Sequence, residues 1–111
     1  MRAPAYVPDA GDVVWLRFDS HAGHEQAGHR PAVVLSPASY NGKTGLMVCC
    51  PLTTRIKSYP FEVLIAGETA AVVLSDQVKN PDWRARGAER KGKVTDLELG
   101  QVRAKLRSLI G

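Results

Sequence analysis

The spacing of apolar residues changes at Thr95, and this change limits the folds that the chain can adopt. Upstream of Thr95 the apolar residues form short runs separated by polar loops, which is typical of strands. Thr95 and Glu98 have the spacing of a capping box, which favours the start of a helix. Downstream, five apolar residues recur at helical intervals, namely Leu99, Val102, Leu106, Leu109 and Ile110. We therefore predict an amphipathic helix over Asp96–Ile110.

Short segments rich in β-branched and aromatic residues precede this helix and predict strands. They are residues 12–18, 32–36, 46–51, 61–65 and 72–74. Pro31 has no amide hydrogen and fits the first position of the second strand. Residues 37–42 predict one helical turn that stops at Gly42. Together these elements predict a mainly β fold with helical additions, either a compact, strongly bent antiparallel sheet or an SH3-like open barrel ending in an amphipathic helix.

The length and charge of the chain bound its organisation and its partners. A chain of 111 residues predicts one domain spanning residues 1–111. It carries 15 basic and 11 acidic residues, and eight of the basic residues but only three acidic ones fall within 84–107. This local excess favours a polyanionic or acidic partner, while a solvated basic surface is the alternative.

Cysteine usage and hydropathy indicate the compartment. Cys49 and Cys50 are adjacent in a predicted strand, so their side chains point to opposite faces and are poorly placed to bridge each other. No apolar stretch approaches the roughly 20 residues that a membrane span needs, and the N-terminus lacks a signal-peptide core. We expect a cytoplasmic protein with no membrane partner.

Candidate chemistry concentrates in the glycine-flanked segment 21–31, which holds a carboxylate, three imidazoles and a guanidinium. Cleavage of RNA without a cofactor needs a base for the 2′-hydroxyl, a cation for the developing charge and a proton for the leaving oxygen. Glu25 suits the first role, Arg30 the second, and His29 could act as acid or base. An exposed Glu25–Arg30 ion pair is the alternative. A second alternative is a zinc site at His21, His24 and His29, but the spacing of these histidines matches no zinc motif. We predict no metal and no cofactor.

A second group of polar side chains follows the predicted strand at 46–51. Thr53 could hydrogen-bond a phosphate oxygen or satisfy a turn backbone. Lys57 and Lys79 could contact phosphates or remain solvated. Gln77 has the donor and acceptor that a base edge requires.

The two tryptophans differ in their surroundings. Trp83 lies beside Arg84 and Arg86, so it could form a stacking platform for a base or an anchor for a partner protein. Trp15 lies within an apolar run, so we expect it in the core.

Five ordered blocks of the sequence resemble the MazF/PemK family of toxins. The resemblance extends from about Tyr6 to the C-terminus, and the blocks are residues 11–15, 25–37, 59–63, 76–79 and 83–87. It implies the toxin of a type II toxin–antitoxin system, folded as the strongly bent β-barrel shared with the CcdB gyrase poison. It also implies a homodimer that cuts single-stranded mRNA at short sequences without a metal, leaving a 2′,3′-cyclic phosphate and a 5′-hydroxyl.

The resemblance also implies roles for individual residues. Glu25 would act in proton transfer, Arg30 would stabilise the phosphorane charge and Thr53 would bind the scissile phosphate. The RNA path would be lined by Phe18, His24, Lys57, Gln77 and Lys79, with base choice set around residues 18–24 and 53–57. An acidic MazE-like antitoxin would bind over the RNA path and contact Trp83, Arg84 and Arg86. The alternatives are a CcdB-like inhibitor of a protein target such as gyrase, and an RNA-binding barrel without catalysis.

Overall fold

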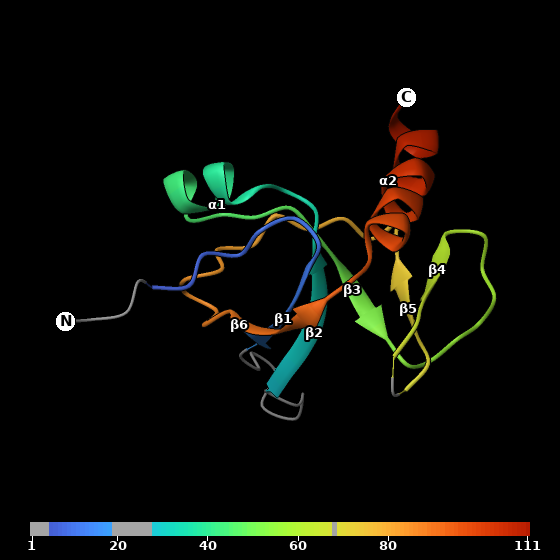
Figure 1. Cartoon of the computed structure of the whole chain (residues 1–111), viewed down its shortest axis with the longest axis horizontal. Helices are drawn as coiled ribbons and strands as arrows, with labels where there is room; N and C mark the ends of the chain where they lie inside the picture. Colours follow the sequence, from blue (N-terminus) through green and yellow to red (C-terminus); the bar gives the residue numbers. More distant parts are fainter. Residues whose placement is uncertain (1–4, 19–27, 68) are drawn as a thin grey trace.

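One curved antiparallel sheet of six strands forms the body of the molecule. The structure is a computed structural model that describes residues 5–18, 28–67 and 69–111. The strand order is β4-β5-β3-β2-β1-β6, and two helices complete the fold (Figure 1). The elements are β1 (Asp12–Phe18), β2 (Gly28–Val34), α1 (Ala38–Thr44), β3 (Cys49–Thr53), β4 (Glu62–Ile65), β5 (Ala71–Leu74), β6 (Glu89–Lys93) and α2 (Asp96–Ile110). The predicted fold class is confirmed.

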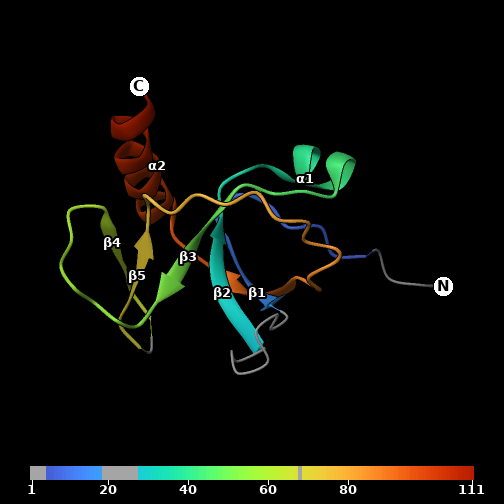
Figure 2. The ribbon, with the colours of Figure 1, turned by 180° about the vertical axis from the view of Figure 1, so that it is seen from behind.

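The sheet bends because β3 changes its neighbour part-way along its length. Residues 49–51 of β3 pair with β2, whereas Leu52 and Thr53 pair with β5. The sheet is therefore divided into a β6-β1-β2 half and a β3-β5-β4 half. Figure 2 shows α2 against the second half, while α1 lies beside the first. The result is a curled half-barrel that leaves a concave opening where the two halves diverge.

Two prolines explain where the ladders stop. Backbone amides along a strand point alternately to its two neighbouring strands. The amide of Leu35 donates to Val48 O, so the amide position of Pro31, four residues earlier, also points toward β3. Proline has no hydrogen to donate there, and the β2–β3 ladder ends at the next pair, Ala32 with Pro51. Pro51 faces the opposite edge of β3, and pairing with β5 begins only at Leu52. The prolines thus mark the point where β3 leaves β2 and joins β5.

The hydrophobic core has two parts, one on each face of the sheet. Cys50 packs with Val33 and Val73 in the first part, whereas Cys49 packs with Val34 and Leu16 in the second. The two thiols are free and point to opposite faces, as the sequence predicts. Burial raises the pKa of Cys49 to about 12 and that of Cys50 to about 11, so both behave as small apolar side chains.

Helix α2 begins at the predicted capping box. The hydroxyl of Thr95 accepts a hydrogen bond from Glu98 N at 3.1 Å, and the carboxylate of Glu98 accepts from Thr95 N at 2.9 Å. Glu98 also accepts from Ala66 N at 2.8 Å, which ties the helix to the end of β4. Leu99 and Val102 are buried against the sheet. The predicted helix is confirmed over its whole length, and no helix among the described residues is long and apolar enough to cross a membrane.

The second strand starts earlier than the sequence indicates. We predicted it at residues 32–36, with Pro31 as its first residue, but β2 begins at Gly28 and Pro31 is its fourth residue. The reason is long-range pairing, because β1 extends to Phe18 and its last residues pair with Gly28, His29 and Arg30. The expectation that Arg30 lies in a loop is therefore wrong, and Arg30 projects from a strand.

Other boundaries differ by a few residues, and one strand was missed. Helix α1 ends at Gly45, whose φ of 76° is left-handed, and not at Gly42. The third strand is shifted from residues 46–51 to Cys49–Thr53, and Leu46 instead forms a single bridge with Asp82. Strand β6 was not predicted because its sequence, ERKGK, is polar throughout. It is an edge strand paired with β1 alone, where exposed charge is expected.

Replacing Glu98 with Gln should lower the free energy of unfolding by about 1 kcal/mol at pH 7, because an amide nitrogen cannot accept one of the two backbone hydrogen bonds. Partial burial raises the pKa of Glu98, but the backbone hydrogen bonds from Thr95 and Ala66 outweigh it and the pKa is lowered overall. The contribution of the Glu98 carboxylate to the free energy of unfolding is therefore fully present above the unfolded-state pKa of about 4.3. It is lost as the pH falls through the pKa of the folded state.

Urea denaturation of the two proteins at a series of pH values measures this difference. The exposed Glu89, replaced by Gln, is the control for removal of one charge. A Glu98→Gln difference that persists unchanged at pH 2 contradicts the assignment.

Candidate active site

A cavity of about 1210 Å³ occupies the concave opening between the two halves of the sheet. Its walls come from β1, β2, β3 and the ends of β4 and β5. The rest of the lining comes from the segment between β3 and β4, the segment between β5 and β6, and Lys91 of β6. Elements far apart in the sequence thus meet at one place, and the cavity is wide enough for a drug-sized ligand or a nucleotide.

The register of the sheet places Arg30 and Thr53 on the same side of this cavity. Ala32 pairs with Pro51, so the antiparallel register, continued by two residues, sets Arg30 opposite Thr53. The two strands have already diverged at this point, and both residues line the cavity between them. The cavity therefore offers a ligand both a guanidinium and a hydroxyl.

The hydroxyl of Thr53 has one known partner. Its Oγ1 accepts a hydrogen bond from Arg55 N at 3.1 Å, which is the turn-satisfying role that the sequence left open. This bond uses an oxygen lone pair, and the hydroxyl hydrogen can still be donated to an acceptor in the cavity.

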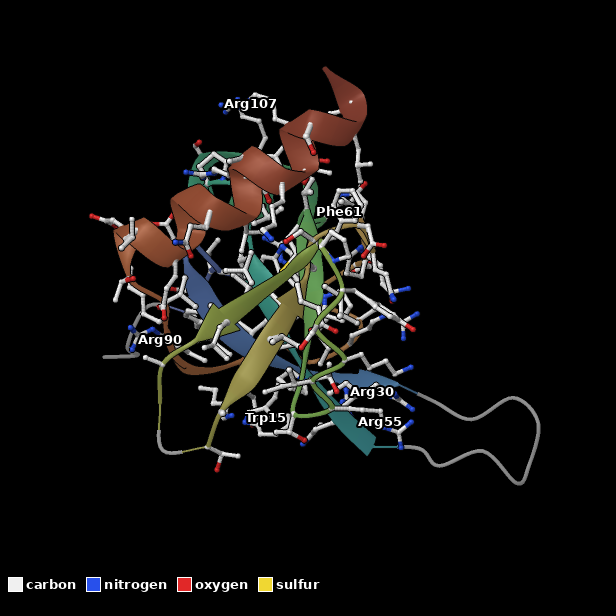
Figure 3. All side chains as sticks on the ribbon, turned by 90° about the vertical axis from the view of Figure 1, so that its right-hand side faces the viewer. Trp15, Arg30, Arg55, Phe61, Arg90 and Arg107 are labelled. Atoms are coloured by element: carbon white, nitrogen blue, oxygen red, sulfur yellow. The ribbon has the colours of Figure 1, made fainter. Side chains whose placement is uncertain are left out.

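The cavity is strongly basic. Two acidic side chains line it, Glu62 and Asp76. Six cationic side chains line it, namely Arg30, Arg55, Lys57, Lys79, Arg86 and Lys91. Cations crowded around a concave surface concentrate positive potential, which attracts and holds a polyanion. Figure 3 shows Arg30 and Arg55 at the same end of the sheet, far from Arg107 on α2.

Comparison with known proteins gives this basic cavity a context. The model of the PemK-like, MazF-like toxins of type II toxin–antitoxin systems matches residues 9–110. The chain belongs to this family. It is 58% identical to the endoribonuclease toxin MazF of Escherichia coli K12 over 107 residues, which are 96% of each chain. It is 32% identical to the endoribonuclease PemK of Escherichia coli, over 92% of this chain and 81% of that one.

A solved structure agrees with the family assignment. The MazE–MazF structure (form II) from Deinococcus radiodurans superimposes with a TM-score of 0.92 and 54% sequence identity, covering 96% of this chain and 98% of the other. The resemblance inferred from the five sequence blocks is therefore confirmed.

The fold of the toxin brings together most of the described residues that the sequence singled out. Five predicted catalytic or RNA-binding residues and one predicted antitoxin contact line the cavity. They are Arg30, Thr53, Lys57, Gln77, Lys79 and Arg86. Glu25 and His24 lie outside the described residues, as does His21 of the alternative zinc site. Of Phe18 only the backbone is described, and it pairs with Gly28 at the end of the β1–β2 hairpin.

Three predicted residues lie away from the cavity lining: Trp83 is buried in the core, and His29 and Arg84 are exposed. His29 is exposed, and as the neighbour of Arg30 in β2 it points to the other face of the strand. Its ring centroid lies 6.3 Å from that of Trp15. Arg84 is exposed outside the cavity, where it donates to Gly42 O and stacks on Trp83. Within the described residues, no three His, Cys, Asp or Glu side chains are gathered as a metal site would require.

The two tryptophans have exchanged the positions that the sequence suggested. Trp83 is only 6% exposed, packs in the core and donates from its indole nitrogen to Asn41 O at 2.9 Å. The expectation that its ring is an exposed platform or anchor is wrong. Trp15, expected in the core, is partly buried and lines the cavity. Alternation along β1 buries Val14 and Leu16 on one face and directs Trp15 to the other, which is the face that carries His29.

Several lining residues were not singled out as site residues in the sequence. Lys91 reaches the cavity because a bulge in β6 leaves it between the residues that pair with β1, and its Nζ lies 4.8 Å from the centre of the Trp15 ring. No signal could identify Lys91 without the missed strand. Tyr59 and Glu62 also line the cavity. Both belong to a block of the family resemblance, and that was the available signal.

Acrylamide quenching of single-tryptophan variants tests the exchanged tryptophans. Trp83→Phe leaves Trp15 as the only emitter, and its fluorescence should be quenched readily because the ring borders an open cavity. Trp15→Phe leaves Trp83, whose quenching constant should be several-fold smaller because the indole is buried. Equal quenching of the two variants would contradict these positions, and circular dichroism checks that both are folded.

Proposed function

We propose that this chain is the toxin of a toxin–antitoxin pair and acts as an endoribonuclease on single-stranded RNA. The observation that carries the proposal is the basic cavity, which gathers Arg30, Thr53 and the candidate RNA contacts in a member of the MazF-like family. Relatives that share almost the whole length of the chain are endoribonucleases.

The proposed reaction needs no metal because RNA supplies its own nucleophile. Glu25 accepts the proton of the 2′-hydroxyl, and the 2′-oxygen attacks the adjacent phosphorus in line with the 5′-oxygen. The 5′-oxygen leaves with a proton, which Glu25 can return after accepting it from the 2′-hydroxyl. The products are a 2′,3′-cyclic phosphate and a 5′-hydroxyl.

Arg30 and Thr53 stabilise the phosphorane in this mechanism. The planar guanidinium of Arg30 can donate two parallel hydrogen bonds to phosphate oxygens, where negative charge develops. The hydroxyl of Thr53, on the facing strand, can donate to the same phosphate. A fixed cation and a fixed donor on two diverging strands are preorganised for the transition state.

The rest of the cavity would bind the RNA on either side of the cut. Lys57 and Lys79 supply charges for flanking phosphates, which affect affinity without selecting sequence. Gln77 supplies an amide for a base edge. Phe18 and His24 are proposed to contact bases.

The proposed partners are a second copy of the chain and an acidic antitoxin. The net charge of +4 and the basic cavity favour an acidic chain that covers the RNA path. Solved MazE–MazF structures resemble this chain over nearly its whole length. Because the Trp83 ring is buried, Arg84 and Arg86 are the members of the predicted contact group with side chains available to an antitoxin. We propose that the pair functions in the cytoplasm.

Incubation with a long single-stranded RNA in excess chelator tests the proposed reaction. We expect discrete cuts whose upstream fragments end in a cyclic phosphate. Arg30→Ala should slow cleavage by about 100-fold or more, the loss typical of removing one group that stabilises transition-state charge. Arg107→Ala is the matched control, because Arg107 lies on α2, remote from the cavity, and its variant should cleave normally.

The other outcomes separate the alternatives. Binding without cuts indicates an RNA-binding barrel, and neither binding nor cleavage indicates an inhibitor of a protein target. Near-normal cleavage by Arg30→Ala would remove Arg30 from the mechanism.

A further inference from the structure

The segment between β3 and β4 carries several of the side chains that line the cavity. Arg55, Lys57, Tyr59 and Phe61 all come from residues 54–61, which belong to no helix or strand. Arg55, Lys57 and Tyr59 are exposed, and the Tyr59 side chain is 59% exposed. A segment with so little burial needs another means of holding these groups toward the cavity.

Glu62 supplies that means through its carboxylate. Oε1 accepts hydrogen bonds from Ser58 N at 2.9 Å and Lys57 N at 3.2 Å, and Oε2 also lies 3.2 Å from Lys57 N. Two successive backbone amides that converge on one anion form a nest, a geometry that favours negative charge. The backbone of Glu62 also donates to Tyr59 O at 3.0 Å, so residues 57–62 are closed into a compact turn.

The backbone of Ser58 has an unfavourable conformation that the hydrogen bond to Glu62 helps to stabilise. Its φ is 61°, in the left-handed region, and it is the single non-glycine residue with positive φ among the described residues. This conformation is costly for a residue with a side chain. Here it directs the Ser58 amide at the Glu62 carboxylate.

The turn is fixed to rigid parts of the fold on both sides. Glu62 is the first residue of β4, and the preceding Phe61 accepts a hydrogen bond at its carbonyl from Ser75 N at 3.0 Å. The ammonium group of Lys105, on α2, donates to Pro60 O. The position of the turn is therefore set by the sheet and by the C-terminal helix.

The turn sets the backbone position from which the Lys57 side chain extends. Its Nζ lies 5.7 Å from the centre of the Tyr59 ring, and both side chains line the cavity. Because the amide of Lys57 is held by Glu62, the ammonium is presented to the cavity from a turn of defined shape. The negative charge of Glu62 should repel RNA phosphates and so weaken RNA binding. Holding the turn that carries Lys57 would offset this effect.

We propose that Glu62 is a positioning residue for RNA binding: it holds the 57–62 turn so that Lys57 points a cation at an RNA phosphate. The proposal rests on the proposed function, and it extends that function to a residue without an assigned role. The proposal predicts that removing the Glu62 charge weakens RNA binding, whereas electrostatic repulsion alone predicts that it strengthens binding. Removing a negative charge from a basic cavity should tighten RNA binding, whereas loss of the positioning role should weaken it.

The test measures KM and kcat for cleavage of a short single-stranded RNA. Glu62→Ala should raise KM about tenfold, the loss expected for one charge-assisted contact, and leave kcat nearly unchanged because Lys57 is proposed to contact a flanking phosphate and not the reacting one. The slope of log affinity against log salt should fall by about one. Asp96→Asn is the control, because it removes one negative charge at an exposed site on α2 and should leave KM unchanged.

A double-mutant cycle shows whether Glu62 acts through Lys57. In a Lys57→Ala background, Glu62→Ala should raise KM by less than about twofold, because the cation to be positioned is absent. Ser58→Gly should bind RNA normally, since glycine adopts positive φ without cost, and Ser58→Val should mimic Glu62→Ala. Amide exchange at Lys57 and Ser58 should accelerate in Glu62→Ala while the melting temperature changes little.

Three results overturn the proposal. They are tighter RNA binding by Glu62→Ala, an additive effect of the two substitutions, and faster amide exchange without any change in KM. A wild-type chain that neither binds nor cleaves RNA would instead overturn the proposed function. The two failures are distinguishable because the first three results require a wild type that cleaves.

Discussion

The missing amide hydrogens of two prolines shape this molecule. Pro31 faces β3 without a donor, and the β2–β3 ladder ends beside it. Pro51 faces the other edge of β3 without a donor, and on that edge pairing with β5 stops at Leu52 while Cys49 pairs with Lys79 instead. Strand β3 consequently leaves β2 and joins β5, which divides and curls the sheet. The cavity opens at this division, and both Arg30 and Thr53 line it. A local property of the backbone thus creates the site, and the side chains occupy the space that it leaves.

The described residues that line the cavity carry an excess of positive charge. Six cationic side chains and two acidic ones line it, so RNA or an acidic antitoxin would relieve their repulsion. The two proposed ligands, RNA and an acidic antitoxin, both carry the negative charge that such a surface attracts. The Glu62 carboxylate accepts hydrogen bonds from two backbone amides of the protein. In the proposal, the Lys57 ammonium stays available to the ligand. In this proposal the cationic side chains bind the ligand, and the acidic Glu62 holds the turn that carries one of them.

Local patterns predicted elements that depend on near neighbours and failed for those that depend on distant pairing. Helix α2 was predicted because its cap and its apolar stripe lie within one segment. The start of β2 was placed late because pairing with β1 extends the strand into glycine-containing sequence. Strand β6 was missed because an edge strand needs little apolar sequence when a neighbour supplies its hydrogen bonds. The Trp83 ring was misplaced because adjacent arginines suggest exposure, whereas the indole is buried against α1 and the sheet.

The amino-acid sequence by itself determined the mainly β fold class, the C-terminal helix, the opposite faces of the two cysteines and the family, because these follow from periodicity, capping and ordered motifs. It also supplied the candidate residues Arg30, Thr53, Lys57, Gln77 and Lys79. Only the tertiary structure decided that these five share one cavity, because their meeting depends on β3 changing partners. It also decided the places of Trp15 and Lys91, since a bulge and the two faces of a strand are set by pairing between distant segments.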